Sequence, residues 1–353
     1  NIGLTLNIAE IIKGTKLFRS ASLTNSYQIQ DGDVWNNVET GLDNSFALWV
    51  RSPLKPTSAF AERQNLTLRD TMNSTQRWSP LEGYKISGRK SALRTLSLTN
   101  NFVKSTQRSE TTNTPSKTVS TTLPDVIASV TQLEKLIFSE KWMRNLQLNV
   151  KYSKRNTLTV GISDDDNTSF GADLRAMIRK RYDSSLGFNL RNSQQKDLRI
   201  NKVTQRTQHK DATLQASFNR GKFRFTPKVD WANDTTTLGT GQKTNDLTII
   251  TPSVLVRADL SLPRGLYLPF TKKTWKFTNR IIWTTTLSMA MRSSPITIAD
   301  NSRLLNLNTS ADYEIAKNLR MTLNGAAARL WHKHLKENEF ISYQFGTTIT
   351  FQF

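Results

Sequence analysis

The sequence predicts an all-β fold for residues 1–353, either an antiparallel transmembrane β-barrel or the C-terminal portion of a very large one. Many short runs alternate between apolar and polar residues with a period of two, the pattern of a strand with one face toward an apolar phase. No run approaches the length of about 18 apolar residues that a transmembrane helix needs. We find roughly 14–16 strand candidates, spaced mostly as successive hairpins.

The composition supports this fold class. Hydrophobic residues make up 37% of the chain and the mean hydropathy is −0.49. Low apolar content combined with many amphipathic strands fits a barrel whose apolar residues face lipid and whose lumen is polar. The chain has no cysteine, which removes disulfides, thiolate metal sites and cysteine nucleophiles. Because it begins at Asn1 without a leader, we expect a mature chain or a piece of a longer one.

The chain is strongly basic, with a net charge of +21 from 49 Lys and Arg against 28 Asp and Glu. The basic residues are dispersed through strands and turns, and no basic helix, RRM-like or zinc-finger pattern is present, so we expect no nucleic-acid partner. A basic lumen, or rim contacts with anionic lipopolysaccharide, accounts for the charge better. The candidates for a basic lumen lining are Lys151, Arg175, Arg191, Arg224, Lys228 and Arg257.

The strand pattern is clearest in the middle of the chain, where Leu146, Leu148 and Val150 alternate with Gln147 and Asn149. Each such run has one apolar and one polar face. Other alternating runs, in chain order, are 2–8, 46–50, 66–68, 96–98, 158–162, 170–178, 186–190, 214–218, 223–231, 254–262, 281–291, 305–313 and 319–323.

The connections between these runs are of two predicted kinds. Residues 154–156, 220–222 and 314–318 are short polar turns, and Gly221 makes the second a tight hairpin. Three longer polar stretches predict exposed loops, which are extracellular if the chain follows the usual asymmetry of outer-membrane barrels. These stretches are 104–122, 192–210 and 233–245.

The last eleven residues, 343–353, form the clearest strand of all. One face carries Tyr343, Phe345, Thr347, Ile349, Phe351 and Phe353, and the other is polar. The length suits a tilted strand crossing a bilayer, which needs about 9–11 residues. This strand resembles the C-terminal signature of bacterial outer-membrane barrels, which the barrel-assembly machinery recognises. The resemblance implies that machinery as a partner and the bacterial outer membrane as the location.

Aromatic residues near the predicted strand ends are candidates for an interfacial girdle, with packing in a core as the alternative. Such girdles mark the levels at which a barrel leaves the hydrocarbon. The candidates are Trp35, Trp49, Trp78, Trp142, Trp231, Trp275, Trp283 and Tyr343.

Two clusters raise the question of metal binding. Asp164, Asp165 and Asp166 offer hard oxygen ligands, but the spacing of an EF-hand loop is missing, so we interpret them as an acidic hairpin tip. His332 and His334 have the spacing of a pair on one strand face, yet Lys333 between them repels a cation, so we interpret them as exposed residues. No Gly-x-Ser-x-Gly or His-Glu-x-x-His motif is present. We predict no catalytic residue, cofactor or metal.

Three further segments share a pattern with one known family. They are Leu123–Val126 followed by Gln132–Leu136, then Leu266–Phe270 leading into Trp275–Asn279, and then Ser310–Leu319. In this order they resemble the C-terminal part of the giant SprA/Sov family, the outer-membrane translocons of type IX secretion. The resemblance covers roughly residues 120–353. Family members are several times longer, so the resemblance implies that this chain is a terminal segment or a split subunit of such a wall.

The resemblance also implies a function and partners. The family forms a pore that passes folded cargo proteins and is gated by a plug or by partner barrels that dock at a lateral opening, without catalysing a reaction, and lipoproteins are further partners that the resemblance implies. Outer-membrane lipids and lipopolysaccharide are the expected surroundings. The alternatives are a self-contained barrel, porin-like or for lipopolysaccharide export, and a soluble adhesin or nucleic-acid-binding β-protein. A self-contained barrel would have to pair residues 2–8 with residues 345–353.

Overall fold

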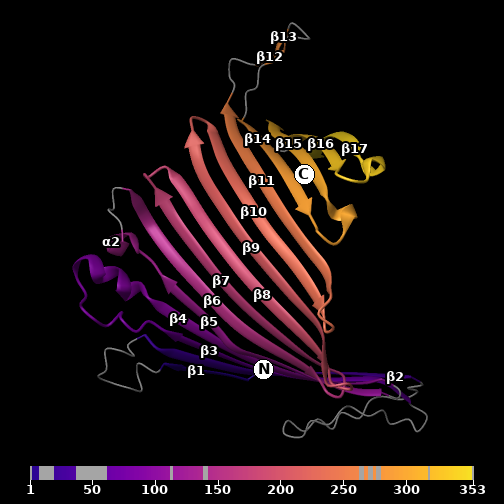
Figure 1. Cartoon of the computed structure of the whole chain (residues 1–353). Coiled ribbons are helices and arrows are strands. Elements are labelled where there is room, and N and C mark those ends of the chain that lie inside the picture. Colours follow the sequence, from indigo (N-terminus) through magenta and orange to yellow (C-terminus); the bar gives the residue numbers. More distant parts are fainter. Residues whose placement is uncertain are drawn as a thin grey trace.

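The computed structural model describes residues 2–7, 20–36, 62–111, 114–137, 142–261, 266–268, 273–275, 280–316 and 319–351. Most of them belong to one 15-stranded sheet in which every pair of neighbours is antiparallel and follows sequence order (Figure 1). The predicted all-β antiparallel fold is therefore confirmed. No helix among the described residues is long and apolar enough to span a membrane.

The strands are long, mostly 14–19 residues in the central part of the sheet. In the described connections lie four short helices, η2 (Gly88–Thr95), α2 (Glu134–Ile137), η3 (Ile298–Asp300) and η4 (Lys336–Asn338). The strands of the sheet are β1 (Ile2–Asn7), β2 (Ser22–Asn36), β3 (Glu62–Trp78), β4 (Ser97–Thr111), β5 (Thr114–Val130), β6 (Met143–Thr159), β7 (Ser163–Ile178), β8 (Tyr182–Asp197), β9 (Lys202–Arg220), β10 (Phe223–Leu238), β11 (Lys243–Ser261), β14 (Arg280–Ser293), β15 (Ser302–Ala316), β16 (Leu319–His332) and β17 (Phe340–Phe351), while β12 (Leu266–Leu268) and β13 (Lys273–Trp275) form a separate hairpin.

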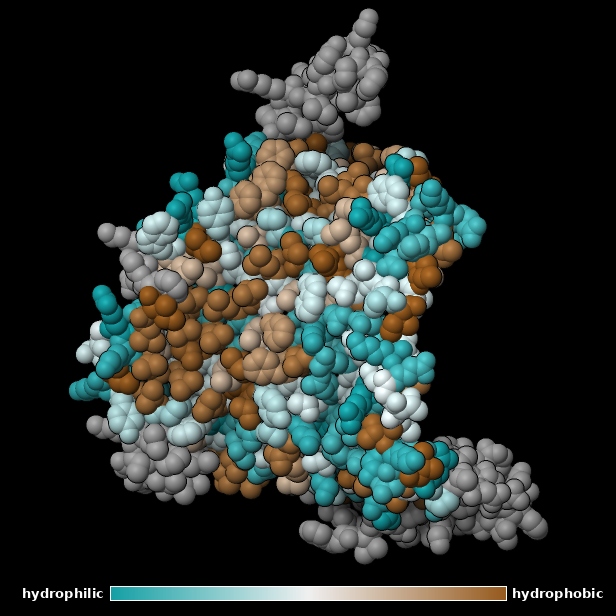
Figure 2. Space-filling model, in the orientation of Figure 1, coloured by the Kyte–Doolittle hydropathy of each residue, from teal (hydrophilic) through white to brown (hydrophobic). Residues whose placement is uncertain are grey.

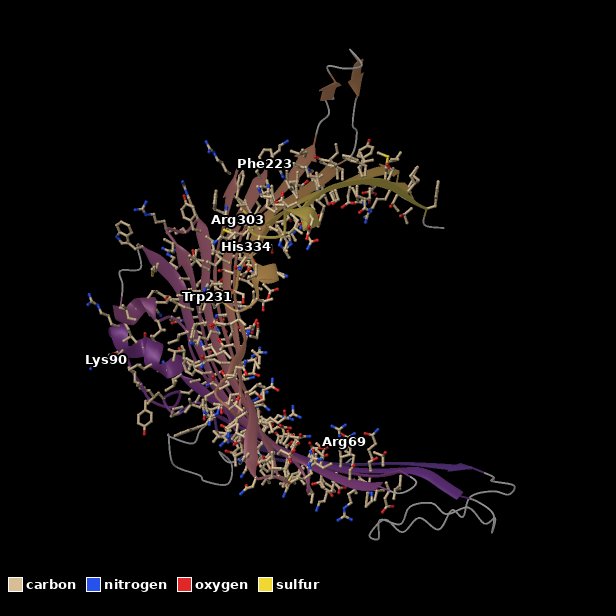
Figure 3. The ribbon with its side chains drawn as sticks, turned by 45° about the vertical axis from the view of Figure 1, so that its right-hand side comes forward. Arg69, Lys90, Phe223, Trp231, Arg303 and His334 are labelled. Atoms are coloured by element: carbon tan, nitrogen blue, oxygen red, sulfur yellow. The ribbon has the colours of Figure 1, made fainter. Side chains whose placement is uncertain are left out.

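The sheet curls into an open arc with a convex and a concave face, and β1 and β17 lie at its opposite rims (Figures 1 and 3). Among the described residues, β1 pairs with β2 alone and β17 with β16 alone. The arc is one layer thick, so it has almost no interior. No large side chain in the described part of the chain is fully buried.

The strands begin and end at two opposite borders of the sheet. We name these borders the α2 end and the η4 end, after helices in the connections there. At the α2 end, η2 joins β3 to β4 and α2 joins β5 to β6. The backbone N–H of Leu146 donates to Oε2 of the buried Glu134 at 2.9 Å, which fixes α2 against the start of β6. At the η4 end, η3 joins β14 to β15 and η4 joins β16 to β17.

The short turns were predicted with mixed success. Gly221 has φ +63 in the two-residue turn between β9 and β10, so the predicted hairpin at 220–222 is confirmed. β15 and β16 pair as the predicted hairpin, but residues 314–316 lie in β15 and not in a turn, and residues 317–318 are outside the described residues. The turn predicted at 154–156 is wrong, because these residues lie inside β6. The Asn156 amide donates to Asp164 and Asp166 across the β6–β7 pair, so the ladder continues there.

The three long polar stretches are not loops. Residues 104–122 belong to β4 and β5 apart from 112–113, residues 192–210 belong to β8 and β9 with a turn at 198–201, and residues 233–245 belong to β10 and β11 with a turn at 239–242. Their polar residues pair across strands instead of leaving the ladder, as in the bond from Gln208 Nε2 to Asn192 Oδ1 at 2.9 Å. All three hairpins lie at the η4 end; their extracellular position stays a prediction.

Some predicted features lie outside the described residues. These are the strand at 46–50, residue 8 of the first run, Trp49 and Phe353, while the side chains of Trp35 and Trp275 are also not described.

Candidate functional site

The convex face carries a band of apolar side chains. On β10 this face presents Phe223, Phe225, Pro227, Val229 and Trp231, and then Asn233, Thr235 and Thr237. Figure 3 shows Trp231 on the convex side of the ribbon. The apolar run therefore covers residues 223–231, a length that matches the roughly 9–11 residues of a strand crossing the hydrocarbon.

The neighbouring strands keep similar limits, so the band is continuous. Convex-face residues are predominantly apolar over 170–178 on β7, 182–190 on β8, 212–218 on β9, 250–258 on β11, 281–291 on β14 and 305–313 on β15, and the register pairs these runs. We call these runs, with 223–231, the apolar band. Figure 2 shows hydrophobic residues gathered over the left and upper parts of this face and hydrophilic ones toward the lower right. The first convex-face residues beyond the band at the η4 end are Thr168, Asn192, Lys210, Asn233, Thr248, Ser293 and Arg303.

An aromatic row borders the band at its α2 end. Tyr182, Phe218 and Phe225 follow one another across three strands, with ring centroids 5.4 Å and 5.5 Å apart. Phe223 continues the row to Trp283, at 6.5 Å and edge-on. Of the residues predicted for a girdle, Trp283 lies in this row and Trp231 at the opposite limit of the band. Trp331, at the η4 end of β16, was not among the predicted girdle residues.

The concave face is polar, and all six basic residues proposed for a lumen lining lie on it. Each is adjacent in sequence to band residues and so points the other way, as Arg257 does between Val256 and Ala258. Arg224 and Arg257 lie directly opposite each other on β10 and β11. Two of the six have carboxylate neighbours: Lys151 Nζ lies 3.8 Å from Asp125, and Lys228 Nζ lies 2.8 Å from Asp230. The remaining four are Arg175, Arg191, Arg224 and Arg257, of which Arg224 donates to Ser217 Oγ at 2.9 Å.

A histidine between two carboxylates on this face was missed at the level of sequence. His209 Nδ1 lies 2.5 Å from Asp234 Oδ1, and Nε2 lies 3.1 Å from Asp211 Oδ1. Asp211 also accepts a bond from the Asn189 amide at 2.8 Å. Each ring nitrogen thus lies beside a carboxylate, and the contact with Asp234 links β9 to β10. Asp211 follows His209 by two residues, but only the register of β9 against β10 reveals Asp234.

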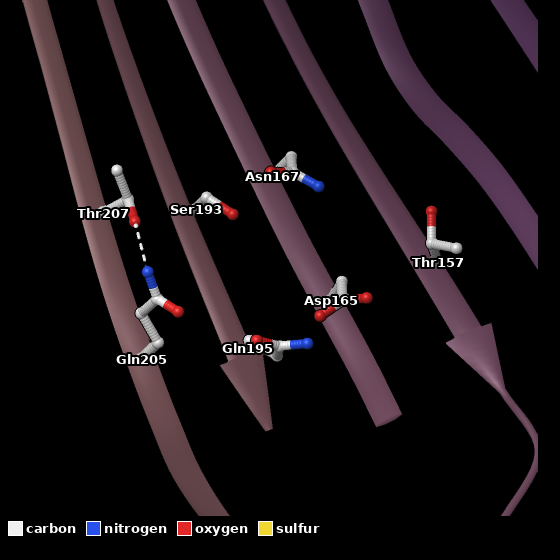
Figure 4. A pocket seen from close by; sticks show the side chains of 7 residues that line it. All are labelled: Thr157, Asp165, Asn167, Ser193, Gln195, Gln205 and Thr207. Atoms are coloured by element: carbon white, nitrogen blue, oxygen red, sulfur yellow. Dashed lines mark hydrogen bonds between the residues drawn. The ribbon is translucent and has the colours of Figure 1, made fainter. Parts of the chain in front are cut away.

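A shallow polar depression of about 360 Å³ lies on the concave face toward the η4 end (Figure 4). Amide and hydroxyl side chains line it, with Asp165 as the single charged group. Gln205 Nε2 donates to Thr207 Oγ1 at 3.5 Å. The lining residues are Thr157, Asp165, Asn167, Ser193, Gln195, Gln205 and Thr207, from four neighbouring strands.

The two sequence clusters considered for metals do not converge. Asp164–Asp166 lie inside β7, and the hairpin tip is at 160–162, so the tip interpretation is corrected. Strand alternation puts Asp164 and Asp166 beside Asn156 on one face and Asp165 on the other. His334 is exposed, but His332 is half-buried, and its Nδ1 has no hydrogen-bond partner among the described residues. The expectation that both histidines are exposed therefore holds for His334 only.

A strand, β17 from Phe340 to Phe351, forms where the C-terminal signature is predicted, and its recognition by the barrel-assembly machinery stays a prediction. Tyr343, Phe345, Ile349 and Phe351 share the convex face of the sheet, opposite residues 319–327 of β16. Within the part of the chain that the structure describes, this strand has a neighbour on one side only, and its side chains are very exposed; Phe345 is 83% exposed and Tyr343 is 70% exposed. Its outer edge therefore presents unpaired backbone groups to whatever lies beyond it.

Comparisons with known proteins give loose structural likenesses only. No protein-family model and no curated protein matches the chain. The copper transporter OprC shares 7% identity at a TM-score of 0.39, with 93% of this chain and 60% of that chain covered, so the chain spans about 60% of that transporter's length. An anion-selective porin from Comamonas acidovorans shares 12% identity at a TM-score of 0.31, with 93% and 98% covered. The beta domain of the Bordetella autotransporter Brka shares 10% identity at a TM-score of 0.25, with 73% and 92% covered.

The class of protein follows from the sheet itself. An antiparallel sheet with an apolar band of membrane height on its convex face, an aromatic row at the border of the band and a polar concave face is the wall of a transmembrane β-barrel. The protein is of the outer-membrane barrel type, and the bacterial outer membrane is its location.

Proposed function

We propose that this chain forms a section of the wall of an outer-membrane channel that conducts folded proteins, as in type IX secretion. The observation that carries the proposal is the open sheet. The unpaired edge of β17 lies at the level of the apolar band, where no water is present to bind free N–H and C=O groups. Each unsatisfied group there costs several kcal/mol, so β17 requires another strand beside it.

The direction of the strands argues that β1 is not that strand. Neighbours in the 15-stranded sheet are antiparallel throughout, so its first and last strands run in the same direction. Direct closure of β17 on β1 would create a parallel pair, whereas bacterial single-chain barrels close with an even number of antiparallel strands. Moreover, β1 has 6 residues and β17 has 12. Both features favour pairing of β17 with a strand beyond this sheet, as in a larger wall.

Other features of the chain support a wide conduit. The concave face is polar and basic and belongs to an arc whose rims stand apart (Figure 3), which suits passive passage of a hydrated protein. Two of the segments that resemble the SprA/Sov family coincide with irregular features of the sheet. Leu123–Val126 lies at an irregularity in the register of β5 with β6, and the β12–β13 hairpin projects from the α2 end (Figure 1).

The test uses the absence of cysteine, which makes every introduced thiol unique. Gly346 on β17 has open space around its Cα, so Gly346→Cys is combined in turn with Gly3→Cys, Leu4→Cys and Thr5→Cys in cells and oxidised. We expect no disulfide within the chain. Gly346→Cys with Asn324→Cys, its direct partner on β16, is the positive control and should cross-link. A disulfide between β1 and β17 would establish a self-contained barrel and end the proposal.

The same background tests conduction. Arg191→Cys on the concave face is expected to form bismaleimide adducts with exported proteins in transit, while Leu186→Cys on the convex face forms none. Equal adducts from both positions, or none from Arg191→Cys, would contradict passage along the concave face. The intact mass of the native chain, near 40.1 kDa or several times larger, then distinguishes a split subunit from a terminal segment.

A further inference from the structure

A second depression lies on the convex face at the η4 end, where β11, β14, β15 and β16 leave the apolar band. Its volume is about 730 Å³, twice that of the polar depression on the concave face. Ile250, Met289 and Met291 give it an apolar floor, and Arg303 and Lys333 border it. The depression thus combines hydrocarbon-facing and cationic groups at one place.

The register fixes its level relative to the membrane. Met291 is the last band residue on β14, and its direct partner on β15 is Arg303, the first convex-face residue beyond the band. Arg303 in turn pairs with Trp331 on β16, a residue type that prefers the interface between hydrocarbon and headgroups. The cations therefore stand at the height of lipid headgroups, directly above an apolar floor. Figure 3 labels Arg303 and His334 at this end.

Neither of these cations forms an ion pair in the described part of the protein. Neither Arg303 nor Lys333 has a carboxylate within 4.0 Å among the described residues. The one carboxylate that lines the depression, Glu339, accepts the backbone N–H of His332 at 3.3 Å. Lys154, just past the band on β6, differs, because its Nζ lies 3.9 Å from Asp166.

A third cation is held in place close by. The Arg329 guanidinium lies over the Trp331 ring, 4.7 Å from its centroid, and Arg329 precedes Trp331 by two residues on the same strand face. Arg303, Arg329 and Lys333 thus surround Trp331 on one convex-face patch. Cations beside hydrocarbon without an internal partner favour an anion supplied by the lipid, and arginine binds phosphate with two parallel hydrogen bonds.

We infer that this patch binds the phosphate of a glycolipid of the outer leaflet, with the phosphate between Arg303 and Lys333 and an acyl chain over Met289 and Met291. The leaflet follows from the strands that continue past the band at the η4 end, because outer-membrane barrels extend farthest on the extracellular side. The inference requires that the convex face contacts lipid. It does not depend on whether the channel conducts proteins or on which strand pairs with β17.

The test measures lipid binding to the purified full chain by native mass spectrometry in detergent. The probes are lipid A, lipid A with its phosphates removed, phosphatidylglycerol and inorganic phosphate. Arg303→Gln with Lys333→Gln should weaken lipid A binding by about tenfold or more, because two charged hydrogen-bonding partners are lost. Arg303→Lys with Lys333→Arg, which keeps both charges, should retain most of the binding. Dephosphorylated lipid A should bind the unmodified chain as weakly as lipid A binds the Gln variant.

The matched control is Lys151→Gln with Arg191→Gln, which removes the same charge from the concave face. It should leave lipid A binding unchanged, and equal loss in both double variants would show non-specific attraction and overturn the site. Inorganic phosphate or phosphatidylglycerol could instead bind as tightly as lipid A and lose the same affinity in the Gln variant. That result would overturn the assignment of the ligand as a glycolipid. Heat-modifiable mobility on gels confirms that each variant is folded, and Trp331→Leu gives a second, uncharged test with a smaller expected loss.

Discussion

Each central strand consists of two regions that share one hydrogen-bond ladder. They differ in the residues on their convex face, which are apolar in one region and polar in the other. In the apolar band, β8 presents Leu186, Phe188 and Leu190 on its convex face and polar residues on its concave face. Past the band, in what we call the polar extension (192–210 and 233–245), the same strands are polar on both faces. The boundary is sharp, since Leu190 and Asn192 are successive residues on one face.

The difference shows that the ladder is held by different forces in the two regions. In the band, lipid offers no hydrogen bonds, so the paired backbone is the only low-energy state. In the extension, water competes for every backbone group, and cross-strand side chains supply the additional contacts. Examples are the bond from Asn233 Nδ2 to Thr248 Oγ1 at 3.0 Å and the bond from Gln208 Nε2 to Asn192 Oδ1 at 2.9 Å. The extension should therefore open more easily than the band.

The largest expected effect comes from placing a charge in the band. Leu186 lies in the middle of the band, between Leu174 and Leu214 on the neighbouring strands, and 49% of it is exposed toward lipid. Leu186→Arg should lower the free energy of unfolding by about 2–4 kcal/mol, because the guanidinium enters hydrocarbon. The measurement is guanidinium unfolding of the full chain in phospholipid vesicles, followed by tryptophan fluorescence.

The comparison is made with Gln194→Arg, on the same face of the same strand but in the extension, beside Asp166 and Arg206. This variant should change stability by no more than about 0.5 kcal/mol. Similar losses at positions 186 and 194 would place the membrane boundary elsewhere and would also remove the basis for the glycolipid site.

A second change tests how tightly the tips of the extension pack. Gly239 lies in the β10–β11 turn, and its N–H donates to Thr204 O at 2.8 Å. An added Cβ would lie 1.8 Å from the backbone oxygen of Val203, so the chain must move. Gly239→Ala should cost about 1–3 kcal/mol, confined to the tips of β9–β11 and visible as faster amide exchange at residue 239, whose N–H makes the bond to Thr204 O. Gly346→Ala, whose Cβ meets nothing within 4 Å, is the control; equal effects would mean that the contact with Val203 is not made.

The period-two pattern predicted the fold and the two faces because each face meets one solvent over many residues. It placed Lys151, Arg224 and Arg257 opposite the apolar residues, and the register confirms that they share the concave face. It failed where both faces are polar. Residues 192–210 have no alternation, so they were predicted to be a loop, although their strand hydrogen bonds continue to the turn at 198–201. Polarity located the segment beyond the band correctly and gave no information about its backbone.

Side-chain contacts between strands were the other feature that the sequence did not predict. His209 meets Asp234, which lies 25 residues away in sequence, and Arg303 faces Trp331, because one particular register aligns them. A shift of one residue would turn each side chain to the opposite face, and no local pattern fixes that choice. The patch of Arg303, Arg329 and Lys333 was missed for this reason, although all three residues were visible as part of the general excess of basic charge.

The smallest expected effect concerns the turn at the tip of the β8–β9 extension. Asp197 Oδ2 accepts a bond from Arg199 Nη2 at 2.7 Å, and Oδ1 accepts the Arg199 backbone N–H at 2.9 Å. These bonds hold the pKa of Asp197 below its ordinary value of 3.8. A carboxyl whose pKa is lowered by folding stabilises the turn above its unfolded pKa and loses that contribution as the pH falls through the folded pKa. Asp197→Asn should therefore speed exchange of the Arg199 amide modestly at pH 7, with no change within the band.

The pH dependence identifies the cause. The difference in exchange between Asp197→Asn and the unmodified chain should shrink below pH 3.8 and vanish once Asp197 is protonated in the folded state. Arg199→Gln removes the donor and leaves the carboxylate, so it should loosen the same turn at pH 7 and return the pKa of Asp197 toward its ordinary value. A difference that persists unchanged at low pH would mean that the aspartate acts through its shape and not its charge. The ion pair would then have no part in holding the extension together.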